Sequence, residues 1–164
     1  MISIIGCVAQ SCVTEGEPDG PVVNVGDRLP NFSVSLSDGT IVSNSSLSGK
    51  TGVIVFFNTN CSDCRKELPV IEQLWQNYKE NPGVQIVAIA REESAEEIEA
   101  YWQQNNLTIP FSPQSNRDVF HLFATSGIPR IFISNPEGVI TQTFSDVALP
   151  GYDQLVEAIQ NSIK

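Results

Sequence analysis

Hydrophobic positions along the chain follow two periods, and the change from one period to the other marks the predicted elements. Nearly continuous apolar runs over 52–57 and 84–90, the second broken only by Gln85, are typical of strands that are buried on both faces. Between them, apolar residues recur at helical spacing and predict an amphipathic helix; its stripe comprises Leu68, Ile71, Trp75 and Tyr78. A strand, a helix and a second strand in succession indicate parallel strands joined by a right-handed crossover.

Shorter patterns complete the predicted fold. Apolar and polar residues alternate over 32–36, Asp38 and Gly39 provide a tight turn, and 40–42 returns, which predicts an N-terminal β-hairpin. The remaining predicted elements are, in chain order, a helix over 94–104 opened by a capping box of Ser94 and Glu97, a short helix over 117–124, strands over 131–133 and 139–144 joined by a turn, and a helix over 152–163. Their order predicts an α/β domain with a central mixed sheet covered by helices on both faces.

Length and charge narrow the possible classes of function. The chain has 164 residues, which fits one domain, and its net charge of −10 makes nucleic acid and anionic lipid surfaces poor partners because phosphate is repelled. No apolar run in the sequence approaches membrane-spanning length, and no glycine pattern for nucleotide binding occurs. Residues 14–20 have the composition of a solvated linker, so we place a tail over 1–24 and the folded domain over 25–164.

The N-terminal tail carries two cysteines. The segment Ile4-Ile5-Gly6-Cys7 resembles a bacterial lipobox, in which the cysteine is lipidated, but no Lys or Arg precedes Cys7 and the apolar run is shorter than a secretion signal needs. Two interpretations stay open: Cys7 is the lipid attachment site of an envelope protein, or the tail is ordinary and carries free thiols. Cys12 has no assigned role and can pair with Cys7 or stay reduced.

The candidate chemistry lies in Cys61-Ser62-Asp63-Cys64, shortly after the first buried strand. At the first turn of a helix, two cysteines three positions apart lie on one face with Cβ atoms about 5–6 Å apart, close enough to form a disulfide with little rearrangement. The unpaired N–H groups of that turn favour a thiolate at Cys61. Cys61 is therefore predicted to attack a partner's disulfide, and Cys64 to resolve the mixed disulfide that forms.

Three roles without redox chemistry compete for the same cysteine pair. A zinc site needs about four ligands, and beyond the pair the sequence offers only Cys7, Cys12 and His121, without a second paired motif. A purely structural disulfide would close so small a loop that it restricts the unfolded chain very little. Two incidental buried cysteines fit poorly with the charged residues beside them. We therefore predict no metal, and no cofactor other than a redox-active disulfide between Cys61 and Cys64.

Four segments carry a resemblance to a known family: 26–32, 47–50, the block over 57–69 that contains the cysteine pair, and Gly127-Ile128-Pro129. With these segments in order, the chain from residue 25 onward resembles the thioredoxin superfamily, and within it the TlpA/ResA-like thiol–disulfide oxidoreductases, which are related to the AhpC/TSA proteins. The resemblance implies a three-layer thioredoxin-like fold with an added N-terminal β-hairpin. It also implies a periplasmic or cell-envelope location; a cytoplasmic location is the alternative.

The resemblance assigns roles to further residues. Ile128-Pro129 matches the family's cis-proline position, which faces the cysteine pair and docks an extended substrate segment. Glu67, three positions after the second cysteine, matches a glutamate thought to handle protons for the pair. The alternative is a surface glutamate that pairs with Arg65 or Lys66.

Pro69 and two departures from the family pattern bear on the prediction. Pro69 inside a helix forces a kink that sets the cysteine turn against the sheet; alternatively, the helix begins at Pro69 and leaves the cysteines on a loop. Asn60 replaces the tryptophan usual before the first cysteine, which removes an apolar docking surface. Asp63 opposes thiolate formation, whereas Arg65 and Lys66 favour it. If the acidic groups prevail, the disulfide is relatively stable and the protein is a reductant.

The predicted function is a thiol–disulfide oxidoreductase that reduces disulfides in extracytoplasmic partner proteins. We expect a monomer that takes its electrons from another dithiol protein or a membrane reductase. Two alternatives stay open. A peroxiredoxin-like thiol peroxidase expects a threonine three positions before the reactive cysteine, where Asn58 stands. A redox-inert thioredoxin-fold module would bind peptides in the same groove without turnover.

Overall fold

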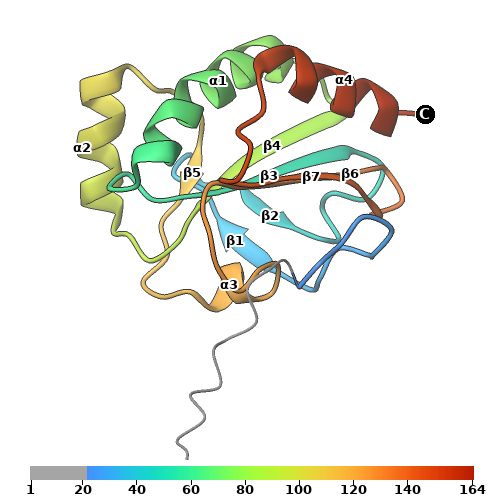
Figure 1. Ribbon diagram of the computed structural model, residues 1–164, viewed down its shortest axis with the longest axis horizontal. Helices are drawn as coiled ribbons and strands as arrows, with labels where there is room; N and C mark the ends of the chain where they lie inside the picture. The colour runs from blue at the N-terminus through green and yellow to red at the C-terminus, as the bar shows by residue number, and fades with distance from the viewer. Residues whose placement is uncertain (1–21) are drawn as a thin grey trace, which may run out of the picture.

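A five-stranded mixed sheet forms the centre of the structure. The computed structural model describes residues 22–164 (Figure 1). The sheet has the order β5-β4-β3-β6-β7, and its strands are β3 (Thr51–Phe57), β4 (Val84–Ala90), β5 (Phe111–Ser112), β6 (Arg130–Ser134) and β7 (Ile140–Phe144). β3 pairs parallel with β4 and antiparallel with β6. The predicted α/β domain with a mixed sheet is confirmed.

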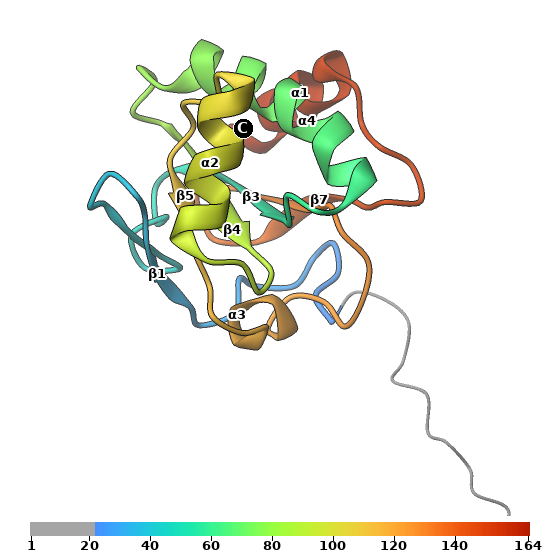
Figure 2. The same ribbon diagram turned by 90° about the vertical axis from the view of Figure 1, so that its left-hand side faces the viewer.

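Helices and a small hairpin cover both faces of that sheet, so the domain has three layers. Figure 1 shows α1 (Ser62–Tyr78) and α4 (Tyr152–Ser162) above the sheet, and α3 (Asp118–His121) below it together with the hairpin of β1 (Ser33–Ser35) and β2 (Ile41–Ser43). α2 (Ala95–Asn105) flanks the sheet at β4 and β5 (Figure 2). The predicted three-layer fold with an N-terminal hairpin is confirmed.

β3 lies at the centre of the core, and every one of its residues is buried. Below the sheet, the ring of Phe56 lies 5.4 Å from that of Phe120 and 6.2 Å from that of Phe132. Above it, the ring of Phe57 lies 5.1 Å from that of Trp102 in α2. Such aromatic pairs contribute about 0.5–1.5 kcal/mol beyond the burial of their area. Because β3 is packed on both faces, the segment that follows it starts from a fixed point.

Two elements differ from the prediction. The sequence pattern does not predict β5 because this strand has only two residues, too few to show any period. The helix expected over 117–124 comprises only Asp118–His121. After this turn the N–H groups of Phe123 and Ala124 both donate to the carbonyl oxygen of Phe120, so the chain continues as a tight bend rather than a regular helix.

The start of the described chain lies close to the predicted domain boundary. The N–H groups of Val22 and Val23 donate to the carbonyl oxygen of Phe123 at 3.0 and 3.1 Å, and Val23 is buried. The boundary at residue 25 stays a prediction, and Cys7 and Cys12 lie outside the described residues. From residue 22 to residue 164, no helix combines the length and the apolar character that a membrane span requires.

Hydrogen bonds to Glu72 connect α1 to the segment that precedes β5. Its carboxylate accepts hydrogen bonds from the N–H groups of Thr108 and Ile109, both at 2.9 Å, from the Thr108 hydroxyl at 2.6 Å and from Gln76 Nε2 at 2.9 Å. Burial acts to raise the pKa of Glu72, but these hydrogen bonds outweigh it and hold the pKa below its ordinary value. Glu72 is therefore ionised at neutral pH and stabilises this junction.

Glu72→Ala is expected to lower the free energy of unfolding at neutral pH by about 1–3 kcal/mol, because two backbone N–H groups lose a charged acceptor. A carboxyl group whose pKa is lower in the folded state contributes stability above its ordinary pKa and loses it as the pH falls through the folded value. The difference between variant and wild type in urea unfolding should therefore shrink below pH 4.5, the ordinary value. Glu99→Ala, at an exposed position of α2, is the matched control. An equal loss there would contradict the role of the hydrogen bonds.

Candidate active site

Cys61 is the residue at which α1 begins. Its backbone is extended, with φ −85° and ψ 124°, and its Sγ accepts a hydrogen bond from the Cys64 N–H at 3.2 Å, as the side chain of an N-cap residue does. The predicted position of the pair at a helix start is confirmed. The alternative that the helix begins at Pro69 is wrong, since Pro69 lies inside α1. A donor is thus in place where charge forms on the Cys61 sulfur.

The two thiols differ in exposure. Both are free; Cys61 is partly exposed, whereas Cys64 is fully buried. Burial raises the pKa of Cys64 far above that of an ordinary thiol, and its hydrogen bond with Cys61 raises the pKa further. A partner's disulfide can reach the first sulfur but not the second. This asymmetry is what an attacking Cys61 and a resolving Cys64 require.

The antiparallel strand β6 brings Ile128 to the cysteine pair. β6 begins at Arg130, and Arg130 pairs with Phe56 near the end of β3, so the segment before β6 lies beside the segment after β3. Cys61 Sγ lies 3.5 Å from the carbonyl oxygen of Ile128, a residue 67 positions away in the chain. The peptide bond between Ile128 and Pro129 is cis. The structure therefore brings together the cysteine pair and the segment predicted to dock the substrate.

Side chains outside the predicted site hold the segment that joins β3 to α1. The carboxylate of Glu93, which is buried, accepts hydrogen bonds from the Thr59 N–H at 2.8 Å and from the Thr59 hydroxyl. Arg65 Nε donates to the Thr59 carbonyl oxygen, and Asn58 Nδ2 donates to the Arg91 carbonyl oxygen at 3.3 Å. The only sequence signal for Arg91 and Glu93 is a run of charged residues directly after a buried strand.

Glu67 is a buried carboxyl group one helical turn after Cys64. It is 2 % exposed, and its Oε1 has no hydrogen-bond partner among the residues described. Burial raises the pKa of Glu67 to about 7. The alternative of a surface glutamate paired with Arg65 or Lys66 is wrong, because Glu67 is buried, Arg65 Nε donates to the Thr59 carbonyl oxygen and Lys66 forms its ion pair with Asp63 at 2.8 Å. A carboxyl group with this pKa can both take up and release a proton near neutral pH.

The residues considered for zinc do not come together in the described part of the chain. Between positions 22 and 164, no three side chains of His, Cys, Asp or Glu lie close enough to hold a metal ion. His121 is exposed on α3. The other two candidates, Cys7 and Cys12, lie outside the described residues.

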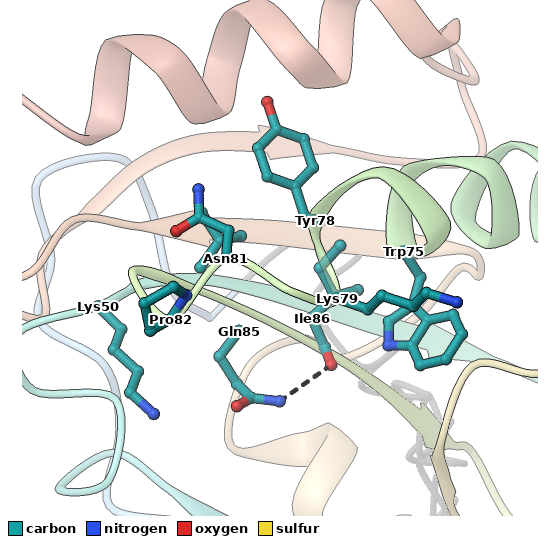
Figure 3. Close-up of a pocket in the computed structure, with 9 residues that line it drawn as sticks. Lys50, Trp75, Tyr78, Lys79, Asn81, Pro82, Gln85 and Ile86 are labelled. Carbon is teal, nitrogen blue, oxygen red and sulfur yellow. Dashed lines mark hydrogen bonds between the residues drawn. The ribbon is translucent and has the colours of Figure 1, made fainter.

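A surface pocket of about 150 Å³ lies where β3 and β4 begin, at the end of the sheet opposite the cysteine pair (Figure 3). Its lining comprises Lys50, Trp75, Tyr78, Lys79, Asn81, Pro82, Val84, Gln85 and Ile86. Figure 3 shows Lys50 and Trp75 on opposite sides of it, and Lys79 Nζ lies 5.2 Å from the centre of the Trp75 ring. Because Thr51 and Val84 pair where β3 and β4 begin, whereas Cys61 follows the end of β3, this pocket is separate from the cysteine pair.

Paired thiols at a helix start exchange with disulfides, and together with the three-layer fold they define the class: a thiol–disulfide oxidoreductase of the thioredoxin superfamily. Residues 25–143 match the AhpC/TSA family, and the chain belongs to that family. The thiol-disulfide oxidoreductase ResA of Bacillus subtilis is 26% identical, and the match covers 99% of this chain and 90% of that protein. The ResA of Oceanobacillus iheyensis is 27% identical over 87% of this chain and 76% of its own length.

Solved structures show the same fold. A solution structure from Bacteroides thetaiotaomicron, named as a candidate protein disulfide isomerase, superposes with a TM-score of 0.78 at 30% identity and covers 88% of this chain and 91% of that chain. StoA of Bacillus subtilis has a TM-score of 0.66 at 22% identity, covers 80% of this chain and 98% of that chain, and supports the fold alone.

Proposed function

We propose that the chain reduces disulfides in partner proteins through the dithiol of Cys61 and Cys64. The Cys61 sulfur attacks one sulfur of the partner's disulfide, a mixed disulfide forms, and the partner's first thiolate leaves. The Cys64 sulfur then attacks Cys61, the second partner thiolate leaves, and the chain is left with a Cys61–Cys64 disulfide. Two electrons pass to the partner, whose two thiolates take up protons from solvent, and the two protons of the dithiol are released to solvent. The observation that carries this proposal is a partly exposed sulfur and a buried one within the first turn of α1.

Burial of the second thiol supports reduction as the direction of electron flow. Because burial raises the pKa of Cys64, this sulfur gains little from forming a thiolate in the reduced protein. A dithiol that is weakly stabilised as a thiolate has a relatively stable disulfide and therefore donates electrons. The Asp63 carboxylate, which lies between the two cysteines in the sequence, would act in the same direction, although its ion pair with Lys66 reduces this effect.

Glu67 is the proposed acceptor of the Cys64 proton. Cys64 must lose its proton as it attacks the mixed disulfide, and its burial makes that loss costly. Glu67 supports this role because it is buried one turn away, has an Oε1 without a partner in residues 22–164 and has a pKa of about 7. Once the partner has left, Glu67 releases the proton towards solvent.

Ile128 and Pro129 are the proposed docking segment for an extended stretch of the partner. The contact of 3.5 Å between the Ile128 carbonyl oxygen and Cys61 Sγ supports this role, because a strand added along the segment would present its disulfide to that sulfur. We further propose that the protein works as a monomer with no cofactor beyond its redox-active disulfide. A second dithiol protein or a membrane reductase would then regenerate the dithiol.

The proposed place of action is the periplasm or cell envelope, with Cys7 as a lipid attachment site. The support is the lipobox-like segment Ile4-Ile5-Gly6-Cys7 and the solvated linker over 14–20. A cytoplasmic protein is the alternative. Fractionation of cells that express the wild type or Cys7→Ser decides between them: release of the variant, but not the wild type, from the membrane fraction supports the anchor.

Cys64→Ser is expected to accumulate partner proteins as mixed disulfides through Cys61, because the resolving sulfur is missing. The complexes should be visible as additional bands on non-reducing gels. They should dissociate when dithiothreitol reduces the mixed disulfide. Cys61→Ser is the matched control and should trap nothing. Partners that remain bound after reduction would instead support a redox-inert binding module. Peroxide consumption at an undiminished rate in Cys64→Ser would support a thiol peroxidase.

A further inference from the structure

Arg91 is a cationic residue in contact with the segment that leads to the redox pair. It is the first residue after β4, and its N–H donates to the carbonyl oxygen of Phe57 at 2.7 Å. Its own carbonyl oxygen accepts the hydrogen bond from Asn58 Nδ2 at 3.3 Å. These two contacts hold Arg91 against the segment that leads from β3 to the cysteines. Its charge acts on the sulfurs of both Cys61 and Cys64.

The side chain of Arg91 is half-buried and incompletely solvated. The guanidinium carbon lies 5.3 Å from the centre of the Phe120 ring, which is itself buried. Nε of Arg91 is buried and lacks a hydrogen-bond partner among residues 22–164. The cation–π contact stabilises the guanidinium, but burial of a charged donor without a partner costs at least as much. An anion close to Arg91 would therefore be strongly favoured.

The neighbouring carboxylates are engaged elsewhere. Glu92 forms an ion pair with Arg117 at 2.7 Å, and Glu93 accepts both hydrogen bonds from Thr59. Within the described residues, no carboxylate forms an ion pair with Arg91. Burial and the charge of Arg117 lower the pKa of Arg91, which again favours a compensating anion. The group near Arg91 that can become negative during the reaction is a cysteine thiolate.

We propose that Arg91 is the counter-ion of the Cys61–Cys64 pair, which stabilises the thiolate form of the dithiol and so shifts the thiol–disulfide equilibrium towards the reduced state. This role rests on the proposed function and adds a residue to that same site. Arg91 is a positioning residue that tunes the reacting sulfurs through its charge and takes no part in bond exchange. That charge also acts to lower the pKa of Cys64, against the larger effect of burial. Removal of the charge should make the protein a stronger reductant.

The test is the equilibrium of the purified protein with reduced and oxidised glutathione. Arg91→Met and Arg91→Gln both remove the charge and keep most of the side-chain stem. Each should shift the equilibrium about tenfold towards the Cys61–Cys64 disulfide, which is about 30 mV for a two-electron couple. The alkylation rate of Cys61 by iodoacetamide at neutral pH should fall about three- to tenfold in both variants. Arg91→Lys, which keeps the charge, should stay within about twofold of wild type in both measurements.

Arg28→Met is the matched control, because it removes one positive charge at the opposite end of the sheet, where Arg28 bridges to Val139. It should leave the equilibrium and the alkylation rate unchanged. If Arg91→Met and Arg91→Gln match the wild type in both measurements, the counter-ion role is overturned. The same holds if Arg91→Lys shifts the equilibrium as much as the uncharged variants do. A wild-type protein that forms no Cys61–Cys64 disulfide with glutathione would overturn the proposed function itself. The two failures are thus distinguishable.

Discussion

Cys61→Ser is expected to lower the rate of disulfide reduction by at least about 10³-fold and to leave the fold intact. A serine hydroxyl is not ionised at neutral pH, so the variant has no nucleophile at the attacking position. Serine is a favoured N-cap residue, and its oxygen can accept the Cys64 N–H that the Cys61 sulfur accepts at 3.2 Å. The free energy of unfolding should therefore change by less than about 1 kcal/mol.

The measurement is a single turnover of the reduced protein with a protein disulfide, with free thiols alkylated at successive times. Cys64→Ser is the informative comparison, because it should release the first partner thiol at a normal rate and then stop at the mixed disulfide. Unfolding in urea, followed in parallel, separates loss of chemistry from loss of fold. Reduction by Cys61→Ser at a rate within about tenfold of wild type would show that another sulfur attacks.

The fold and the cysteine pair are predictable from sequence because they depend on local patterns. The runs over 52–57 and 84–90 are apolar throughout most of their length, since β3 and β4 lie inside the sheet and are covered on both faces. The start of α1 is also predictable from neighbouring residues, because the sulfur of the N-cap residue Cys61 and the Cys64 N–H that donates to it are only three positions apart. The family resemblance then supplied Ile128 and Pro129, which spacing alone could not place.

The rest of the site depends on the register between strands, which a local pattern does not contain. Arg91 and Glu93 reach the segment before the cysteines only because β4 runs parallel to β3 with Ala90 opposite Phe57. From sequence alone, the run of charges after β4 is equally compatible with a solvated surface. Glu67 shows the same limit, since its spacing fits both a buried carboxyl group and a surface ion pair, and only the packing of α1 decides between them.

Glu67→Gln is expected to remove a loss of about 3 kcal/mol in the free energy of unfolding that the wild type undergoes as the pH rises from 4.5 to about 7. The pKa of Glu67 rises from 4.5, its ordinary value, to about 7 in the folded protein, and a difference of this size corresponds to about 3 kcal/mol. A glutamate with a raised folded pKa binds its proton more tightly in the folded state, so the wild type loses stability as the pH rises from 4.5 to about 7. Glutamine carries no charge at any pH and loses none of this stability.

The difference in unfolding free energy between Glu67→Gln and wild type should therefore move in favour of the variant between about pH 4 and pH 8. This comparison cancels any constant cost of burying the amide. The control Glu99→Gln, exposed on α2, should show no such trend.

In single turnover at neutral pH, Glu67→Gln should resolve the mixed disulfide about 10²-fold more slowly, because the amide cannot accept the Cys64 proton. A stability trend without slower resolution would make Glu67 a buried acid that takes no part in proton transfer, and the proton would then leave Cys64 by another route.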